Sequence, residues 1–267
     1  MIREPVVSGQ FYPERKEELE KTIEAFKQKE SSKISAKAII LPHAGYIFSG
    51  KVAVITVNKV LSKHKIIILG NNHTGIGPDF SLWPKGAWKI PNGKVEIDED
   101  LASAILSSGS IIKEDYSAHR DEHSIEVELP ILKYFFGGFK IIPIACKDTD
   151  LETYQEAASQ IFEAVKKTKS DVLLVASSDM THYEPDATVR KKDRQAIDSI
   201  INLDEEGLIA KVKRENISMC GVAPVVVLLD CVKKLGARKA QVAMYQTSGD
   251  AGGNYSSVVG YAGIIIK

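Results

Sequence analysis

The chain of 267 residues is long enough to form one large α/β domain or two small ones, each with a full hydrophobic core. Its 35 basic and 35 acidic residues cancel, so no charge excess favours nucleic acid, an anionic membrane or a basic partner. The three cysteines, Cys146, Cys220 and Cys231, are widely spaced without a CxxC motif, which favours a reducing compartment over a disulfide framework. Because no signal-peptide core and no apolar run approaching ~18 residues is present, we expect a cytoplasmic protein.

The first third of the chain alternates helical patterns with short apolar runs. Residues 14–29 carry apolar side chains at helical spacing among charged ones, which predicts an amphipathic surface helix. The elements expected here are, in order, that helix, a polar linker at 31–35, a strand at 38–41, a helix at 49–61 capped by Ser49, and a strand at 65–69.

The rest of the chain continues this alternation. Residues 80–94 contain both tryptophans and several Gly and Pro residues, and predict irregular strands or a hairpin. Because strands alternate with helices and no linker forces a boundary, residues 1–267 are expected to form a single α/β domain, with a central, largely parallel or mixed sheet flanked by helices. The further expected elements are helices at 98–106, 151–167, 187–201, 204–215 and 222–235, and strands at 140–145, 172–175, 240–245 and 256–266.

Three of the six histidines stand shortly after predicted buried strands. These are His43, His73 and His182, and Asp179 precedes the last of them. Ligands of open α/β sheets bind at the carboxyl ends of parallel strands, so these side chains are predicted to converge at one edge of the sheet. Imidazole and carboxylate together suit Fe, Zn, Cu or Mn. The alternative is that each histidine satisfies a backbone carbonyl at a strand end, because the spacing of an HExxH motif is absent.

The polar run at residues 117–124 supports two interpretations. If a helix begins there, the acidic residues stabilise its N-terminus. Alternatively, His123 transfers protons or orients a substrate, since its reference pKa of ~6.5 allows either role near neutrality. The remaining histidines, His64 and His119, are expected to be solvated.

Two further features lie in the C-terminal third. Cys220 precedes a predicted helix N-terminus, where the pKa of a thiol falls, but no base is close to it in the sequence. Residues 247–253 contain three glycines and predict a turn rather than a phosphate cradle, because neither GxxxxGK[ST] nor GxGxxG is present. Asp250 of this turn is a candidate anionic ligand at the same end of the sheet.

Seven sequence blocks occur in order from Glu4 to Gly263: EPVVSGQFYP, LPHAGYIFSG, LGNNHTG, DEHSIEVELP, VASSDMTHY, CGVAPV and YSSVVGYAG. Together they resemble the Memo family, also called AmmeMemoRadiSam system protein B, over essentially the whole chain. The resemblance implies a fold similar to that of the class III extradiol non-heme iron dioxygenases, with a pocket at the edge of the sheet.

The resemblance also implies a bound divalent metal, iron, copper or zinc, and redox activity. It implies His43 and His73 as metal ligands, with His182 and His123 lining the same cleft. Animal members of the family complete the metal site with a cysteine in the loop before the last strand, where this chain has no cysteine and Asp250 or Ala251 falls nearest. Thiolate selects soft metals such as Cu(I), whereas histidine with carboxylate is typical of Fe(II) sites. If Asp250 or Asp179 replaces the thiolate, iron, manganese or zinc is favoured over copper; if nothing replaces it, a weak or empty site is expected.

Two functions follow from these observations. The first is a metal-dependent, dioxygenase-like oxidoreductase of unknown substrate, in which His182, His123 and Asp179 are catalytic. The second is a non-catalytic protein that binds a small molecule or a short peptide in the same pocket. The system name suggests a radical-SAM protein as a partner, and neither nucleic acid nor a membrane is expected. The residues expected to line the pocket are Tyr46, Asn72, Glu122, Tyr183 and Cys220.

Overall fold

A mixed β-sheet forms the centre of the molecule. The computed structural model describes residues 1–28 and 32–267, so Lys29 of the first predicted helix and Ser31 of the predicted linker lie outside the described residues. The strands are β1 (Ile2–Arg3), β2 (Ala38–Leu41), β3 (Lys65–Asn71), β4 (Phe80–Leu82), β5 (Ala87–Ile90), β6 (Gly93–Ile97), β7 (Ile112–Glu114), β8 (Lys140–Cys146), β9 (Val172–Ser177), β10 (His182–Glu184), β11 (Ala240–Thr247) and β12 (Val258–Ile266).

Neighbouring strands follow the order β1-β5-β6-β8-β3-β9-β2-β12-β10, with β11 beside β12 and β4 beside β7 and β8. The inner strands β6, β8, β3, β9 and β2 are parallel, whereas β12 pairs antiparallel with β2, β10 and β11. Strands β2, β3, β8 and β9 are buried on both faces over nearly their whole length, which explains their continuous apolar runs, whereas three of the five residues of β6 are exposed. The predicted α/β class with a mixed sheet is therefore confirmed.

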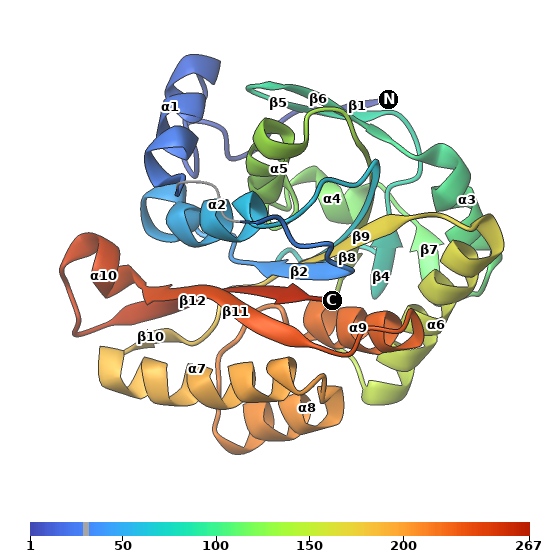
Figure 1. The fold of residues 1–267 in the computed structure, drawn as a ribbon. Coiled ribbons are helices and arrows are strands. Elements are labelled where there is room, and N and C mark those ends of the chain that lie inside the picture. Colours follow the sequence, from blue (N-terminus) through green and yellow to red (C-terminus); the bar gives the residue numbers. More distant parts are fainter. Residues whose placement is uncertain (29–31) are drawn as a thin grey trace.

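Helices cover both faces of this sheet (Figure 1). In that view α1, α2 and α5 lie above the central strands, and α7, α8 and α9 lie below them. Within residues 1–28 and 32–267, no helix combines the length and apolar character that a membrane crossing requires. The helices are α1 (Lys16–Phe26), the π-helical turn η1 (Tyr46–Gly50), α2 (Lys51–Asn58), α3 (Glu99–Ser107), α4 (Ser117–Arg120), the 3-10 turn η2 (Glu126–Glu128), α5 (Leu129–Phe136), α6 (Leu151–Thr168), α7 (Asp186–Ile201), α8 (Glu205–Arg214), α9 (Val222–Lys234) and α10 (Ser248–Gly252).

Two local predictions are wrong. Ser49 does not cap a helix, because its hydroxyl lies within η1 and donates to the carbonyl oxygen of Ala44. Residues 247–253 do not form a simple turn but contain the short helix α10, whose N-terminus has a reciprocal capping box between Thr247 and Asp250. Residues of both segments line the pocket at the carboxyl ends of the central strands, so the η1 turn and helix α10 contribute to the shape of that pocket.

Candidate metal centre

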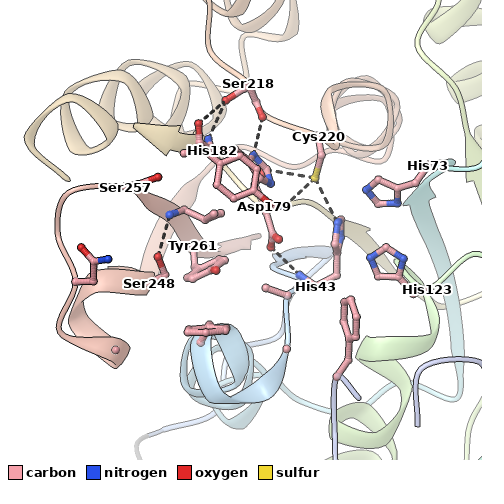
Figure 2. A pocket seen from close by; sticks show the side chains of 18 residues that line it. His43, His73, His123, Asp179, His182, Ser218, Cys220, Ser248, Ser257 and Tyr261 are labelled. Atoms are coloured by element: carbon pink, nitrogen blue, oxygen red, sulfur yellow. Dashed lines mark hydrogen bonds between the residues drawn. The ribbon is translucent and has the colours of Figure 1, made fainter. Parts of the chain in front are cut away.

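Three histidines meet at the carboxyl ends of β2 and β3. His43 follows β2, His73 follows β3, and His123 lies in the turn between α4 and η2. One ring nitrogen from each lies within 4.8 Å of the other two, so these histidines can together hold a metal ion. The rings of His73 and His123 stack with their centroids 4.7 Å apart, and His43 meets both of them edge-on. Figure 2 shows the three side by side in the pocket.

A single carboxylate orients two of these rings. Oε1 of Glu122, which is 2 % exposed, lies 2.9 Å from Nδ1 of His73 and 3.5 Å from Nδ1 of His123. The same carboxylate accepts the backbone N–H groups of His73 and Ser124. Burial raises the pKa of Glu122, but the hydrogen bond and charge of His73 and the N–H of Ser124 outweigh it and lower the pKa to about 2. Because Nδ1 faces Glu122 in both rings, Nε2 is the nitrogen available to a metal.

Glycine lets the segment that carries His123 approach the sheet. A Cβ atom at Gly70, near the end of β3, would stand 2.5 Å from Cγ1 of Ile125 and 2.6 Å from Oγ of Ser124. The hydroxyl of Ser124 also donates to the carbonyl oxygen of Asn71 at 2.7 Å. Close contact with β3 therefore fixes His123 beside His73.

We expect Glu122→Gln to weaken metal binding about 10- to 100-fold, because the variant loses the negative charge behind both rings. Competitive Zn(II) titration of the purified protein measures this change. Glu205→Gln is the matched control, since Glu205 is a buried carboxylate paired with Lys233 on other helices. Equal Zn(II) affinity of the wild type and Glu122→Gln would contradict this role of Glu122.

The third ring, His43, has different neighbours. Its Nδ1 lies 2.8 Å from Oγ of Ser177 and its Nε2 lies 3.3 Å from Sγ of Cys220. Burial, followed by the charges of His73 and His123, lowers the pKa of His43 well below its ordinary value. His43 is therefore neutral at physiological pH, as a metal-binding imidazole must be.

Cys220 differs from its prediction. Burial, with the nearby charge of Asp179, raises the pKa of the Cys220 thiol instead of lowering it. The thiol accepts the backbone N–H of Asp179 at 3.3 Å and lies beside His43 (Figure 2). A cysteine thus stands at the histidine cluster, although it comes from the loop before α9 and not from the loop before the last strand.

The structure places Asp250 away from the histidine cluster. Its carboxylate lies 2.7 Å from Nη2 of Arg190 and accepts the backbone N–H of Thr247 at 2.8 Å. These contacts occupy the carboxylate in capping α10 and pairing with α7. His123, and not Asp250, lies with His43 and His73 in the group that could hold a metal ion, so a carboxylate ligand no longer gives a reason to disfavour copper.

A cavity of about 800 Å³ opens in front of the histidine cluster. His182 and Asp179 line it opposite His73 and His123. Nδ1 of His182 lies 2.8 Å from the carbonyl oxygen of Ser218, which can only accept, so Nδ1 carries the hydrogen and Nε2 has a lone pair. Burial lowers the pKa of His182, which keeps this ring neutral. Burial raises the pKa of Asp179 to about 7, against the opposing effect of the N–H groups of His43 and Ala44.

Of the five residues predicted to line the pocket, Tyr183 and Cys220 do so. Tyr46 lies in the core, 2 % exposed, and its hydroxyl donates to the carbonyl oxygen of Val127. The side chain of Asn72 is buried and its amide donates to the carbonyl oxygen of Ile76, while Glu122 lies behind the histidines. Several lining residues come from distant segments and were not predicted from the sequence: Phe11, Ser218, Ser248, Ser257 and Tyr261.

The N-terminal segment supports the histidine cluster from behind. The guanidinium of Arg3 pairs with Glu126 at 2.6 Å, donates to the carbonyl oxygens of His119 and Glu122, and lies over the ring of Trp88. His119 is fully buried, contrary to the expectation that it is solvated, because its ring packs against Trp83 and Trp88. His64 is exposed as expected. Further along this segment, the ring of Phe11 contacts His123, with centroids 4.8 Å apart.

These features define an α/β protein with a mixed sheet and a three-histidine cluster at the carboxyl ends of its central strands. Residues 3–265 match the family described as "Memo-like protein", and the chain belongs to this family. It is 41% identical to the MEMO1 family protein MK0963 of Methanopyrus kandleri over 282 residues, which cover 100% of this chain and 99% of the relative. It is 44% identical to a MEMO1 family protein of Aquifex aeolicus over 268 residues, covering 99% and 98%.

A solved structure extends the comparison to the fold. The uncharacterized protein JW3007 of Escherichia coli K12 superposes with a TM-score of 0.52 at 12% identity, covering 84% of this chain and 98% of that one. At this level of identity the similarity shows a shared fold and nothing about a shared reaction.

Proposed function

We propose that the protein is a metal-dependent oxidoreductase that acts on a small molecule bound in front of the histidine cluster. The observation that carries the proposal is the convergence of three imidazoles on the wall of a cavity of about 800 Å³. A cavity of this size suits a small-molecule ligand. His43, His73 and His123 would hold the metal, with the Cys220 thiol as a further ligand. Imidazole suits iron, copper and zinc, and thiolate favours the softer of these, so the donor set fits such an ion.

A metal in this position would act as a Lewis acid towards a substrate oxygen. His182 supplies the complementary base, because its Nε2 has a lone pair and its ring is held by Ser218. Asp179 fixes the loop that bears His43 by accepting its backbone N–H at 2.9 Å. The raised pKa of Asp179 also allows this carboxyl group to hold a proton near neutrality.

Replacement of His182 tests the catalytic part of this proposal. His182→Asn removes the base but none of the three imidazoles of the cluster, so we expect metal binding to persist while turnover falls about 10²- to 10⁴-fold. An oxygen-uptake screen with catechol-like compounds, using protein loaded with Fe(II) or Cu(I), provides the assay. His64→Asn is the matched control, because His64 is an exposed histidine outside the cavity. Equal turnover by the wild type and His182→Asn would contradict a role for His182 as the base.

A second candidate function is ligand binding without turnover, and the mouth of the cavity favours it. Phe48 and Tyr183 are 37% and 77% exposed there, although large aromatic side chains are usually more buried. Tyr183 also has a φ of +59°, a strained conformation for an aromatic residue that is typical of functional sites. A binding protein of this kind would show no turnover in any metal form. Its ligand would protect Tyr183 from chemical modification.

A further inference from the structure

A buried polar relay lies behind His43, on the side away from the cavity. Oγ of Ser177, the last residue of β9, lies 2.8 Å from Nδ1 of His43. The same oxygen lies 2.7 Å from the carbonyl oxygen of Ser124 and 2.8 Å from Oε1 of Glu128. Ser177 and Glu128 are both 0% exposed. One hydroxyl group thus has three polar partners and no access to solvent.

The number of hydrogens on each group determines which partner donates in the three hydrogen bonds of Ser177. A serine hydroxyl has one hydrogen to donate and two lone pairs that accept. The carbonyl oxygen of Ser124 can only accept, so it takes the hydrogen of Ser177. Oγ must then accept from both other partners. Nδ1 of His43 therefore carries a hydrogen, and the carboxyl group of Glu128 is protonated.

The surroundings of Glu128 agree with this assignment. Its second oxygen, Oε2, is buried and makes no hydrogen bond within the described part of the chain. An ionised carboxylate in that position would lack the solvation its charge requires, whereas the carbonyl oxygen of a neutral acid is tolerated. Burial, together with the nearby charge of Asp179, raises the pKa of Glu128 well above its ordinary value.

The contact on the other side of His43 agrees as well. Sγ of Cys220 lies 3.3 Å from Nε2 of His43. A thiol is a weak donor, and it can donate to this nitrogen only if the nitrogen has a lone pair. Hydrogen on Nδ1 and a lone pair on Nε2 satisfy the neighbours on both sides of the ring.

We propose that Ser177 and protonated Glu128 are positioning residues that hold His43 in the one neutral tautomer able to bind a metal through Nε2. Only the metal-binding part of this inference rests on the proposed function, because the tautomer is a property of the metal-free protein. The relay gives His43 electrostatic surroundings that differ from those of His73 and His123. The carboxylate charge of Glu122 lies behind His73 and His123, whereas a neutral hydroxyl and a neutral acid lie behind His43.

The tautomer is measured directly by NMR of ¹⁵N-histidine-labelled, metal-free wild type at neutral pH, with the His43 signals identified by their loss in His43→Asn. We expect hydrogen on Nδ1, and hydrogen on Nε2 would overturn the proposal. Infrared difference spectra between the wild type and Glu128→Gln test the acid. We expect the wild type to show the carbonyl band of a protonated carboxylic acid, and a carboxylate band in its place would overturn the role of Glu128.

Titration with Co(II) tests the consequence for the metal. We expect Ser177→Ala to bind Co(II) about 10- to 100-fold more weakly than the wild type, with a changed visible spectrum. Ser199→Ala, which removes another buried hydroxyl, is the control and should match the wild type. Unchanged affinity and spectrum in Ser177→Ala would overturn the positioning role. If Ser177→Ala does not fold, the NMR result on the wild type decides the question. If the wild type binds no Co(II), the proposed function fails while the tautomer assignment stands or falls by NMR.

Discussion

The double variant His43→Ala/His73→Ala is expected to lose stoichiometric metal binding completely. It removes two of the three imidazoles that lie close together, and the one remaining imidazole with the Cys220 thiol provides too few ligands for tight binding in competition with water and buffer. Elemental analysis of protein purified without a histidine tag gives the metal content. Anaerobic titration with Fe(II), Cu(I) and Zn(II) then gives affinity and stoichiometry for the wild type and the variant.

His64→Ala is the matched control for this experiment, because it removes a surface imidazole and should leave binding at one ion per chain. Circular dichroism must show that the double variant keeps its secondary structure. Retention of tight binding by the double variant would refute the assignment of the cluster. Absence of binding in both proteins would remove the metalloenzyme proposal and leave ligand binding in the cavity.

Arg3→Met is expected to lower the free energy of unfolding by about 3–5 kcal/mol, because it leaves the Glu126 carboxylate buried without its counter-charge. The two side chains are 3% and 1% exposed and 2.6 Å apart. Glu126 would keep the N–H groups of Val6 and Val7 and the hydroxyl of Tyr12, which donate hydrogen bonds but carry no charge. Urea denaturation of the metal-free protein measures the difference.

The control for Arg3 is Arg214→Met. Arg214 pairs with Glu215 at the surface, where the side chains are 64% and 33% exposed, so we expect a change below about 1 kcal/mol. The double variant Arg3→Met/Glu126→Gln should recover part of the loss, since it also removes the buried charge. A small effect of Arg3→Met, equal to that of Arg214→Met, would show that the N-terminal segment contributes little to stability.

The sequence was sufficient to predict the inner sheet closely. The predicted strands at 38–41, 140–145 and 172–175 begin where β2, β8 and β9 begin, because a strand buried on both faces appears as a continuous apolar run. The sequence also indicated that four polar residues would lie around one cavity, because parallel strands place their carboxyl ends at one edge of the sheet. These residues are His43, His73, Asp179 and His182.

The parts that could not be predicted depend on contacts between distant segments. Only the family resemblance placed Glu122 and His123 at the pocket. They reach the cluster because their turn packs against Gly70, and nothing in the local pattern shows that approach. Asp250 was assigned from its place in the chain, but its pairing with Arg190 depends on where α7 lies. His119 stands in a polar run that is typical of a solvated segment, but its ring is buried against Trp83 and Trp88, which come from a distant part of the chain.

The pairing of β12 with β2 has a consequence for biosynthesis. Residues 258–266 must be present before β2 has both of its neighbours, and Cys220 joins His43 from 177 residues further along the chain. A growing chain that has only reached residue 200 contains His43, His73 and His123 but neither Cys220 nor β12, so its site is incomplete. Ions taken up during synthesis would be held weakly, and the folded protein would select its ion from the pool available afterwards. If the proposed metal binds, cellular metal supply, more than the order of translation, should then decide which ion occupies the site.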